Sequence, residues 1–144
     1  MARFVYPCPL RWSDMDAFGH VNNTEFFRYL EEARVNLLFA RASQVGVATL
    51  AEGIVVARHD IDYQRPLAWR PEPVLIEARV TRIGAASFTL AYQIRDDNHI
   101  YATASSVMVP YSQDEGRPRR LTEPERTYLA GFLTDEEVTR IPGE

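Results

Sequence analysis

Hydrophobic side chains recur at every third or fourth position between Asn23 and about Ala42. The apolar positions are Phe26, Leu30, Ala33, Leu37 and Ala40. This spacing matches the turn of an α-helix, so the pattern predicts one long amphipathic helix. Asn22 or Asn23 is expected to be its N-cap, and Glu25 stands at the capping-box position relative to Asn22.

Apolar and polar residues alternate with a period of two in four later segments, which indicates β-strands. The segments run over residues 54–63, 74–82, 87–95 and 100–111. Residues 4–12 predict a further strand, placed at a sheet edge because it contains two prolines. The connections at 83–86 and 96–99 are short enough for antiparallel hairpins.

These elements together predict an α+β fold, with one five-stranded antiparallel sheet wrapped around one long central helix. Residues 122–125, Thr-Glu-Pro-Glu, have capping-box spacing and an early proline, and they predict a short C-terminal helix. The length of 144 residues suits a single domain over 1–144, with residues 112–144 expected to form a peripheral tail.

The charged residues exclude several classes of reaction and of partner. All 16 basic residues are arginine, which excludes lysine Schiff-base chemistry and the phosphate-binding loop that requires a lysine. The net charge is −4 and no basic stripe follows the chain, so we expect no nucleic-acid partner.

No segment approaches the roughly 18 unbroken apolar residues of a membrane span, so we expect a soluble protein without membrane insertion. The N-terminus lacks the features of a signal peptide, and a cytoplasmic location is expected. Cys8 is the only cysteine, which excludes an intrachain disulfide and favours a structural thiol.

A loop rich in Asp, Asn and Gly joins the first strand to the helix: residues 14–23 read DMDAFGHVNN. Together with EEAR at 31–34, IDYQRPL at 61–67 and GAASF at 84–88, it resembles acyl-CoA thioesterases of the 4-hydroxybenzoyl-CoA thioesterase type. The resemblance covers about residues 4–111. It implies the hot-dog fold and hydrolysis of acyl-CoA thioesters.

The resemblance assigns the catalytic carboxylate to Asp16 and the N–H group that polarises the thioester carbonyl to Asn23, while Asp14 is structural. A carboxylate placed before a helix N-terminus suits such chemistry, because the free N–H groups there can stabilise an oxyanion. Asp16 could attack the acyl carbon or deprotonate a water molecule, and the sequence leaves both routes open. His20 is a candidate orienting or acid group, with a packing role at the helix entry as the alternative.

Five residues complete the candidate substrate-binding set: Gly19, Asn22, Thr24, Arg65 and Ser87. Arg65, like Arg70 and Arg82, is a candidate for the phosphates of coenzyme A, since arginine binds phosphate bidentately. Ser87 matches a serine that some family members place near the thioester. The pair Asn22-Asn23 stands where aromatic-acyl members often carry an aromatic residue, and it is more similar to fatty acyl-CoA or acyl-carrier-protein thioesterases.

Three alternatives remain: an acyl-carrier-protein thioesterase, a non-catalytic acyl-CoA-binding module and a hot-dog hydratase. The Asp-to-His spacing in the loop argues against the hydratase. No metal and no cofactor is expected, because the histidines lack metal-ligand spacing and a carboxylate with water suffices. A single sheet leaves open edges, and family members form dimers, so we expect a homodimer or homotetramer.

Overall fold

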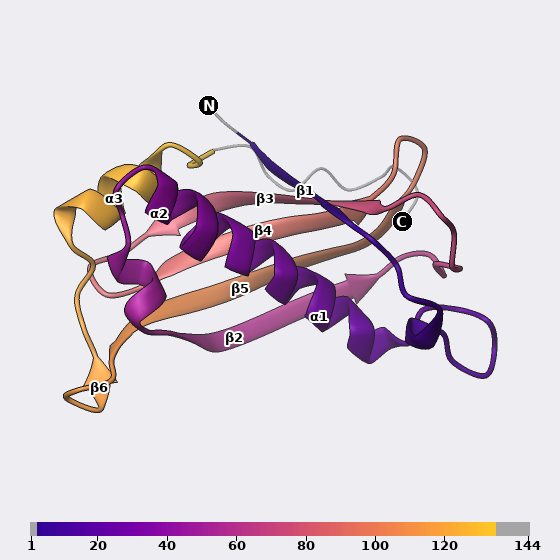
Figure 1. Cartoon of the computed structure of the whole chain (residues 1–144), viewed down its shortest axis with the longest axis horizontal. Helices are drawn as coiled ribbons and strands as arrows, with labels where there is room; N and C mark the ends of the chain where they lie inside the picture. Colours follow the sequence, from indigo (N-terminus) through magenta and orange to yellow (C-terminus); the bar gives the residue numbers. More distant parts are fainter. Residues whose placement is uncertain (1–2, 135–144) are drawn as a thin grey trace.

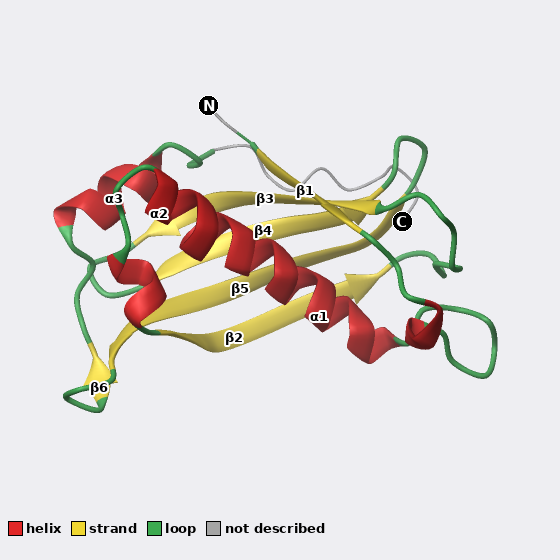
Figure 2. Cartoon of the chain, viewed as in Figure 1, coloured by secondary structure: helices red, strands yellow, loops and turns green. Residues whose placement is uncertain are grey.

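The computed structural model describes residues 3–134, which form one curled sheet with a long helix across one face (Figures 1 and 2). The strands are β1 (Phe4–Cys8), β2 (Ile54–Tyr63), β3 (Val74–Ile83), β4 (Phe88–Arg95), β5 (Ile100–Ser112) and β6 (Arg117–Pro118). Neighbouring strands are antiparallel in the order β1-β3-β4-β5-β2, and β6 pairs only with β5. The predicted α+β fold is therefore confirmed.

The strands follow the alternation of the sequence closely, with two departures. β1 ends at Cys8 rather than near residue 12, because Pro9 has no N–H to continue the ladder, and Trp12–Asp14 form a 3-10 turn. β6 was not predicted from its two residues. Register shifts at Val56/Arg58 in β2 and at Val80/Arg82 in β3 mark bulges, which bend the strands around the helix.

The predicted helix is continuous from residue 23 to residue 44, but its middle is wound differently. It consists of α1 (Asn23–Arg34), a π-helical stretch (Val35–Arg41) and α2 (Ala42–Gln44). Where the π-helical stretch begins, the Val35 N–H is shared between the carbonyls of Glu31 and Glu32. The apolar spacing carried no sign of this change in winding.

The apolar stripe of the helix packs directly on the inner face of the sheet. Tyr29, Leu30 and Leu37 of the helix and Ile76 and Leu90 of the sheet are fully buried. Each such side chain contributes roughly 1.5–3 kcal/mol to stability through burial. This packing fixes the helix relative to the sheet and therefore the position of the helix N-terminus.

The helix α3 (Glu123–Ala130) covers the far end of the core and forms the predicted capping box between Thr122 and Glu125. The Glu125 carboxylate is buried and pairs with Arg119 at 2.7 Å, and it also accepts a hydrogen bond from Thr49 Oγ1 at 2.7 Å. Leu129 and Phe132 are buried in the core. Among the described helices, none combines the length and apolarity that a membrane crossing requires.

Candidate functional site

The loop between β1 and α1 is held in shape by its own backbone. The Asn22 N–H donates to the Asp14 carbonyl at 2.9 Å, and the Asp16 N–H donates to the His20 carbonyl at 2.8 Å. The Val21 N–H donates to the Leu67 carbonyl at 2.6 Å, which ties the loop to the segment after β2. Gly19 turns the loop with a φ of 77°, a conformation that favours glycine. The tip is thus fixed beside the helix start.

Asp14 anchors this loop to the helix. Its carboxylate is buried and accepts hydrogen bonds from Tyr29 Oη at 2.7 Å, Arg28 Nη2 at 2.8 Å and Arg11 Nε at 3.0 Å. Burial by itself raises the pKa of Asp14, but the bonds from Arg11 and Tyr29 and the charge of Arg28 outweigh it and lower the pKa. All of its capacity is used within the protein, which fits the structural role expected for Asp14.

Asp16, two residues later, is held by only one of its oxygens. Oδ1 accepts the Phe18 N–H at 2.9 Å and the His20 N–H at 3.4 Å. Oδ2 has no hydrogen-bond partner within residues 3–134, and the residue is half-buried. One oxygen therefore fixes the direction of the carboxylate, and the other is free to meet a substrate or a water molecule.

The start of α1 exposes a free donor close to this carboxylate. Asn22 is the N-cap: its Oδ1 accepts the Thr24 N–H at 3.0 Å and the Thr24 hydroxyl at 2.8 Å. The Asn23 N–H finds no acceptor in the described part of the chain. The predicted capping box with Glu25 is wrong, because the Glu25 carboxylate binds Arg28 at 2.8 Å instead of returning to the cap.

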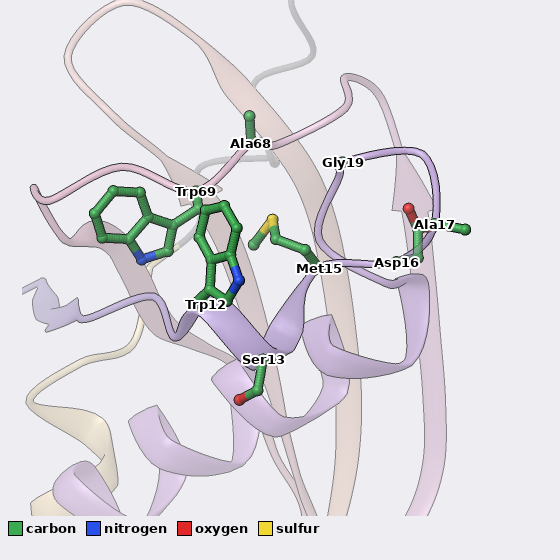
Figure 3. Close-up of a pocket in the computed structure, with 8 residues that line it drawn as sticks. All are labelled: Trp12, Ser13, Met15, Asp16, Ala17, Gly19, Ala68 and Trp69. Carbon is green, nitrogen blue, oxygen red and sulfur yellow. The ribbon is translucent and has the colours of Figure 1, made fainter.

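Two cavities meet at Asp16, and it is the one described residue that both share. The first measures about 340 Å³ and also contains Asn23, Phe26, Tyr63 and Arg65. The second measures about 540 Å³ and is lined by Trp12, Ser13, Met15, Ala17, Gly19, Ala68 and Trp69 (Figure 3). We call them the Asn23 cavity and the tryptophan cavity.

Six of the eight predicted site residues fall into three groups. Asp16, Asn23 and Arg65 line the Asn23 cavity, Gly19 lines the tryptophan cavity, and Asn22 with Thr24 builds the helix cap. The His20 ring is exposed and makes no hydrogen bond within the described residues, so the packing role considered for it is not seen.

Ser87 is not brought to this site within one chain. It precedes β4, and the register pairs the start of β4 with the ends of β3 and β5. Asp16 instead shares a cavity with Tyr63, the last residue of β2, which pairs with Ala102 near the start of β5. The loop that joins β1 to α1 lies at the opposite end of the sheet from the β3–β4 turn (Figure 1). The eight residues of β4 span roughly 25 Å. Ser87 could reach an Asp16 site only from a second copy of the chain. Arg70, which was also considered for the phosphates of coenzyme A, forms an ion pair with Asp96.

Two functional candidates were missed by the sequence analysis. Tyr63 donates from its hydroxyl to the Asn23 carbonyl at 2.9 Å and packs edge-on against Phe26, which steadies the helix start. Trp12 is 75% exposed and lines the tryptophan cavity. A large aromatic residue just before the Asp- and Asn-rich loop was the available signal, but the strand expected over residues 4–12 concealed it.

A thioesterase-like superfamily model matches residues 10–141 of the chain. The chain belongs to the thioesterase-like superfamily. A Bacillus subtilis (strain 168) relative, the uncharacterized protein YsmA, is 30% identical over 127 residues, which cover 88% of this chain and 84% of that protein.

Solved thioesterase-like structures share the hot-dog fold. A predicted thioesterase from Bacillus stearothermophilus matches with a TM-score of 0.80 at 25% identity, covering 94% of this chain and 100% of its own. A thioesterase from Thermus thermophilus, complexed with coenzyme A and Zn, matches with a TM-score of 0.74 at 28% identity, covering 89% and 92%. These likenesses support thioester hydrolysis as the general activity of this thioesterase-like protein.

The Thermus structure also contains zinc. Over residues 3–134, no group of three or more His, Cys, Asp or Glu side chains is arranged to hold a metal ion. Cys8 is buried and burial raises its pKa to about 11, so its thiol stays protonated and fits the structural role expected for it.

Proposed function

We propose that this protein hydrolyses acyl-CoA thioesters to the free acid and coenzyme A, with Asp16 as the catalytic carboxylate. One observation carries the proposal: a carboxylate with one fixed and one free oxygen shares a cavity with the free N–H at the start of α1. Thioester cleavage needs those two groups, an anionic nucleophile or base and a donor for the developing oxyanion.

The thioester carbonyl oxygen accepts the Asn23 N–H, and the positive end of the helix dipole adds to its polarisation. Free Oδ2 of Asp16 then attacks the acyl carbon, or it takes a proton from a water molecule that attacks instead. Collapse of the tetrahedral intermediate breaks the C–S bond and expels the coenzyme A thiolate. In the first route water then hydrolyses the acyl-Asp16 anhydride, so both routes give the same acid and thiol.

Asn22, Thr24 and Tyr63 position this donor rather than react. The cap takes up the Thr24 N–H and leaves the Asn23 N–H as a free donor on a residue that lines the cavity, while the Tyr63 hydroxyl donates to the Asn23 carbonyl. His20 belongs to the same loop and is exposed, which makes it a candidate to protonate the leaving thiolate. No cofactor is needed for any of these steps.

Arg65 supports coenzyme A as the thiol. It is exposed at the Asn23 cavity and forms no ion pair within the described part of the chain, so its guanidinium can meet an anionic group. The Thermus relative, whose structure holds coenzyme A, adds to this argument.

Thiol release from purified protein tests the proposal. The substrates are acetyl-, octanoyl- and phenylacetyl-CoA, with octanoyl acyl-carrier protein in a parallel reaction and Asp16→Ala as the inactive reference. We expect release from at least one coenzyme A thioester by wild type only. Release from the carrier-protein thioester alone would mean that the substrate carries its acyl group on acyl-carrier protein and not on coenzyme A. Tight binding of every thioester without release would instead identify a binding module.

A further inference from the structure

The exposed aromatic side chains of this protein gather at one end of the molecule. Within residues 3–134 four aromatic residues are exposed, namely Trp12, Phe18, Tyr63 and Trp69, and all lie on the two segments that frame Asp16. An exposed apolar cluster that borders a cavity is a mark of a binding site.

The two tryptophans are held as a pair rather than as loose surface residues. Their ring centroids are 5.9 Å apart and their planes meet at 74°, so they form two nearly perpendicular walls. The Trp69 indole N–H donates to the Leu10 carbonyl at 3.3 Å, which fixes that ring. Figure 3 shows the Met15 side chain reaching into the space between these rings and the Asp16 loop.

The two cavities that meet at Asp16 differ in charge. The Asn23 cavity contains Arg65, whereas the lining of the tryptophan cavity includes no cationic side chain and no acid except Asp16 itself among the described residues. A thioester bound with its reacting carbon at Asp16 extends in two directions, toward its thiol part and toward its acyl part. The anionic thiol part suits the cavity with the arginine, which leaves the tryptophan cavity for an uncharged acyl group.

We infer that Trp12 and Trp69 determine acyl specificity by holding a flat aromatic acyl group, a refinement that rests on the proposed thioesterase function. Perpendicular indoles suit a ring, which stacks on one indole and meets the other edge to face. The Met15 thioether adds a favourable contact to a ring, and Gly19 and Ala68 leave space for it. The volume of about 540 Å³ accommodates one or two fused rings.

Tryptophan fluorescence reports ligand binding in this cavity, because Trp12 and Trp69 are the two tryptophans of the whole sequence. The Asp16→Asn variant, which we expect to bind substrate without turning it over, is titrated with phenylacetyl-CoA, octanoyl-CoA and free coenzyme A. We expect phenylacetyl-CoA to change the emission and to bind about tenfold more tightly than octanoyl-CoA, and free coenzyme A to leave the emission unchanged. An equal change with free coenzyme A would assign the cavity to the nucleotide and overturn the inference.

Kinetics separate this inference from the proposed function. Trp12→Ala and Trp69→Ala should lower kcat/KM for phenylacetyl-CoA about tenfold and for acetyl-CoA less than threefold, while Trp69→Phe retains most activity. Val45→Ala is the control: it removes another exposed apolar side chain, at the far end of the helix, and should leave kcat/KM for both substrates unchanged. An equal loss on both substrates would contradict the assignment. If wild type released no thiol but the emission change persisted, the proposed function would fail and the aromatic site would stand.

Discussion

Two aspartates two residues apart have opposite surroundings, and this difference underlies the different roles that we propose for them. The Asp14 carboxylate is saturated by Arg11, Arg28 and Tyr29, whereas Asp16 keeps one oxygen free of partners within residues 3–134. A carboxylate saturated by the protein cannot accept a further proton or attack a substrate without breaking those bonds.

Asp14→Asn should therefore destabilise the fold rather than alter the chemistry alone. The amide cannot neutralise Arg28 or accept all of the bonds, so we expect a loss of about 2–3 kcal/mol of unfolding free energy and a fall in Tm of roughly 6–9 °C. Calorimetry of the variant measures this. Asp97→Asn, at an exposed turn position, is the control and should leave Tm unchanged. An unchanged Tm for Asp14→Asn would show that the hydrogen bonds of the Asp14 carboxylate do not stabilise the fold.

At the scale of elements, the buried Glu125 carboxylate on α3 makes the stability of the fold sensitive to acid. Burial raises the pKa of Glu125, but the bonds from Arg119, the Thr122 N–H and Thr49 outweigh it and lower the pKa to about 2. In the unfolded chain this carboxyl titrates near 4.5. Between these values the unfolded state binds more protons, so the stabilisation is complete above about pH 4.5 and is lost as the pH falls toward 2.

Glu125→Gln should remove that pH dependence. We expect the unfolding free energy of wild type to fall by on the order of 3 kcal/mol through this group between about pH 4.5 and 2. The variant should be less stable at neutral pH, and its unfolding free energy should depend less on pH in the acid range. Urea unfolding at several pH values measures the slope. Identical slopes for the two proteins would mean that Glu125 is not the titrating group.

The sequence predicted the elements well where the spacing of apolar residues alone determines them. Strand β2 was predicted at its observed bounds and β3 to within one residue, from the period-two alternation of apolar and polar residues along each segment. The π-helical stretch was not predictable, since a change of winding leaves the apolar stripe intact. The loop was recognised by its residue types, but the capping box failed because Arg28 competes for Glu25. The partnership of Trp12 with Trp69 depends on tertiary contact, which no local pattern encodes.

At the scale of the whole molecule, the sheet ends in two unequal edges. β1 has five residues and contains Pro7, but β2 has ten residues and, among the described strands, pairs only with β5. A long open edge strand tends to pair with another chain. We therefore expect a homodimer joined along β2, which becomes the unit of a homotetramer only if the sheets or helices of two dimers also pack.

Light scattering and hydrogen exchange together test this arrangement. The expected mass is at least twice the 16.5 kDa of one chain. The β2 N–H groups that point away from β5 should exchange slowly, because a second chain accepts their hydrogen bonds. A mass of one chain, or fast exchange at those groups in a larger assembly, would contradict a β2 interface.

We propose that Asp16 performs the chemistry, and steady-state hydrolysis of the best coenzyme A thioester by Asp16→Asn measures its contribution. Asparagine keeps the shape and the Oδ1 bonds but removes the nucleophilic charge. We predict that kcat falls by about 10³-fold or more, with KM within about threefold and an unchanged Tm, and that Asp97→Asn behaves as wild type. A kcat within tenfold of wild type would contradict the account and place the chemistry at another group.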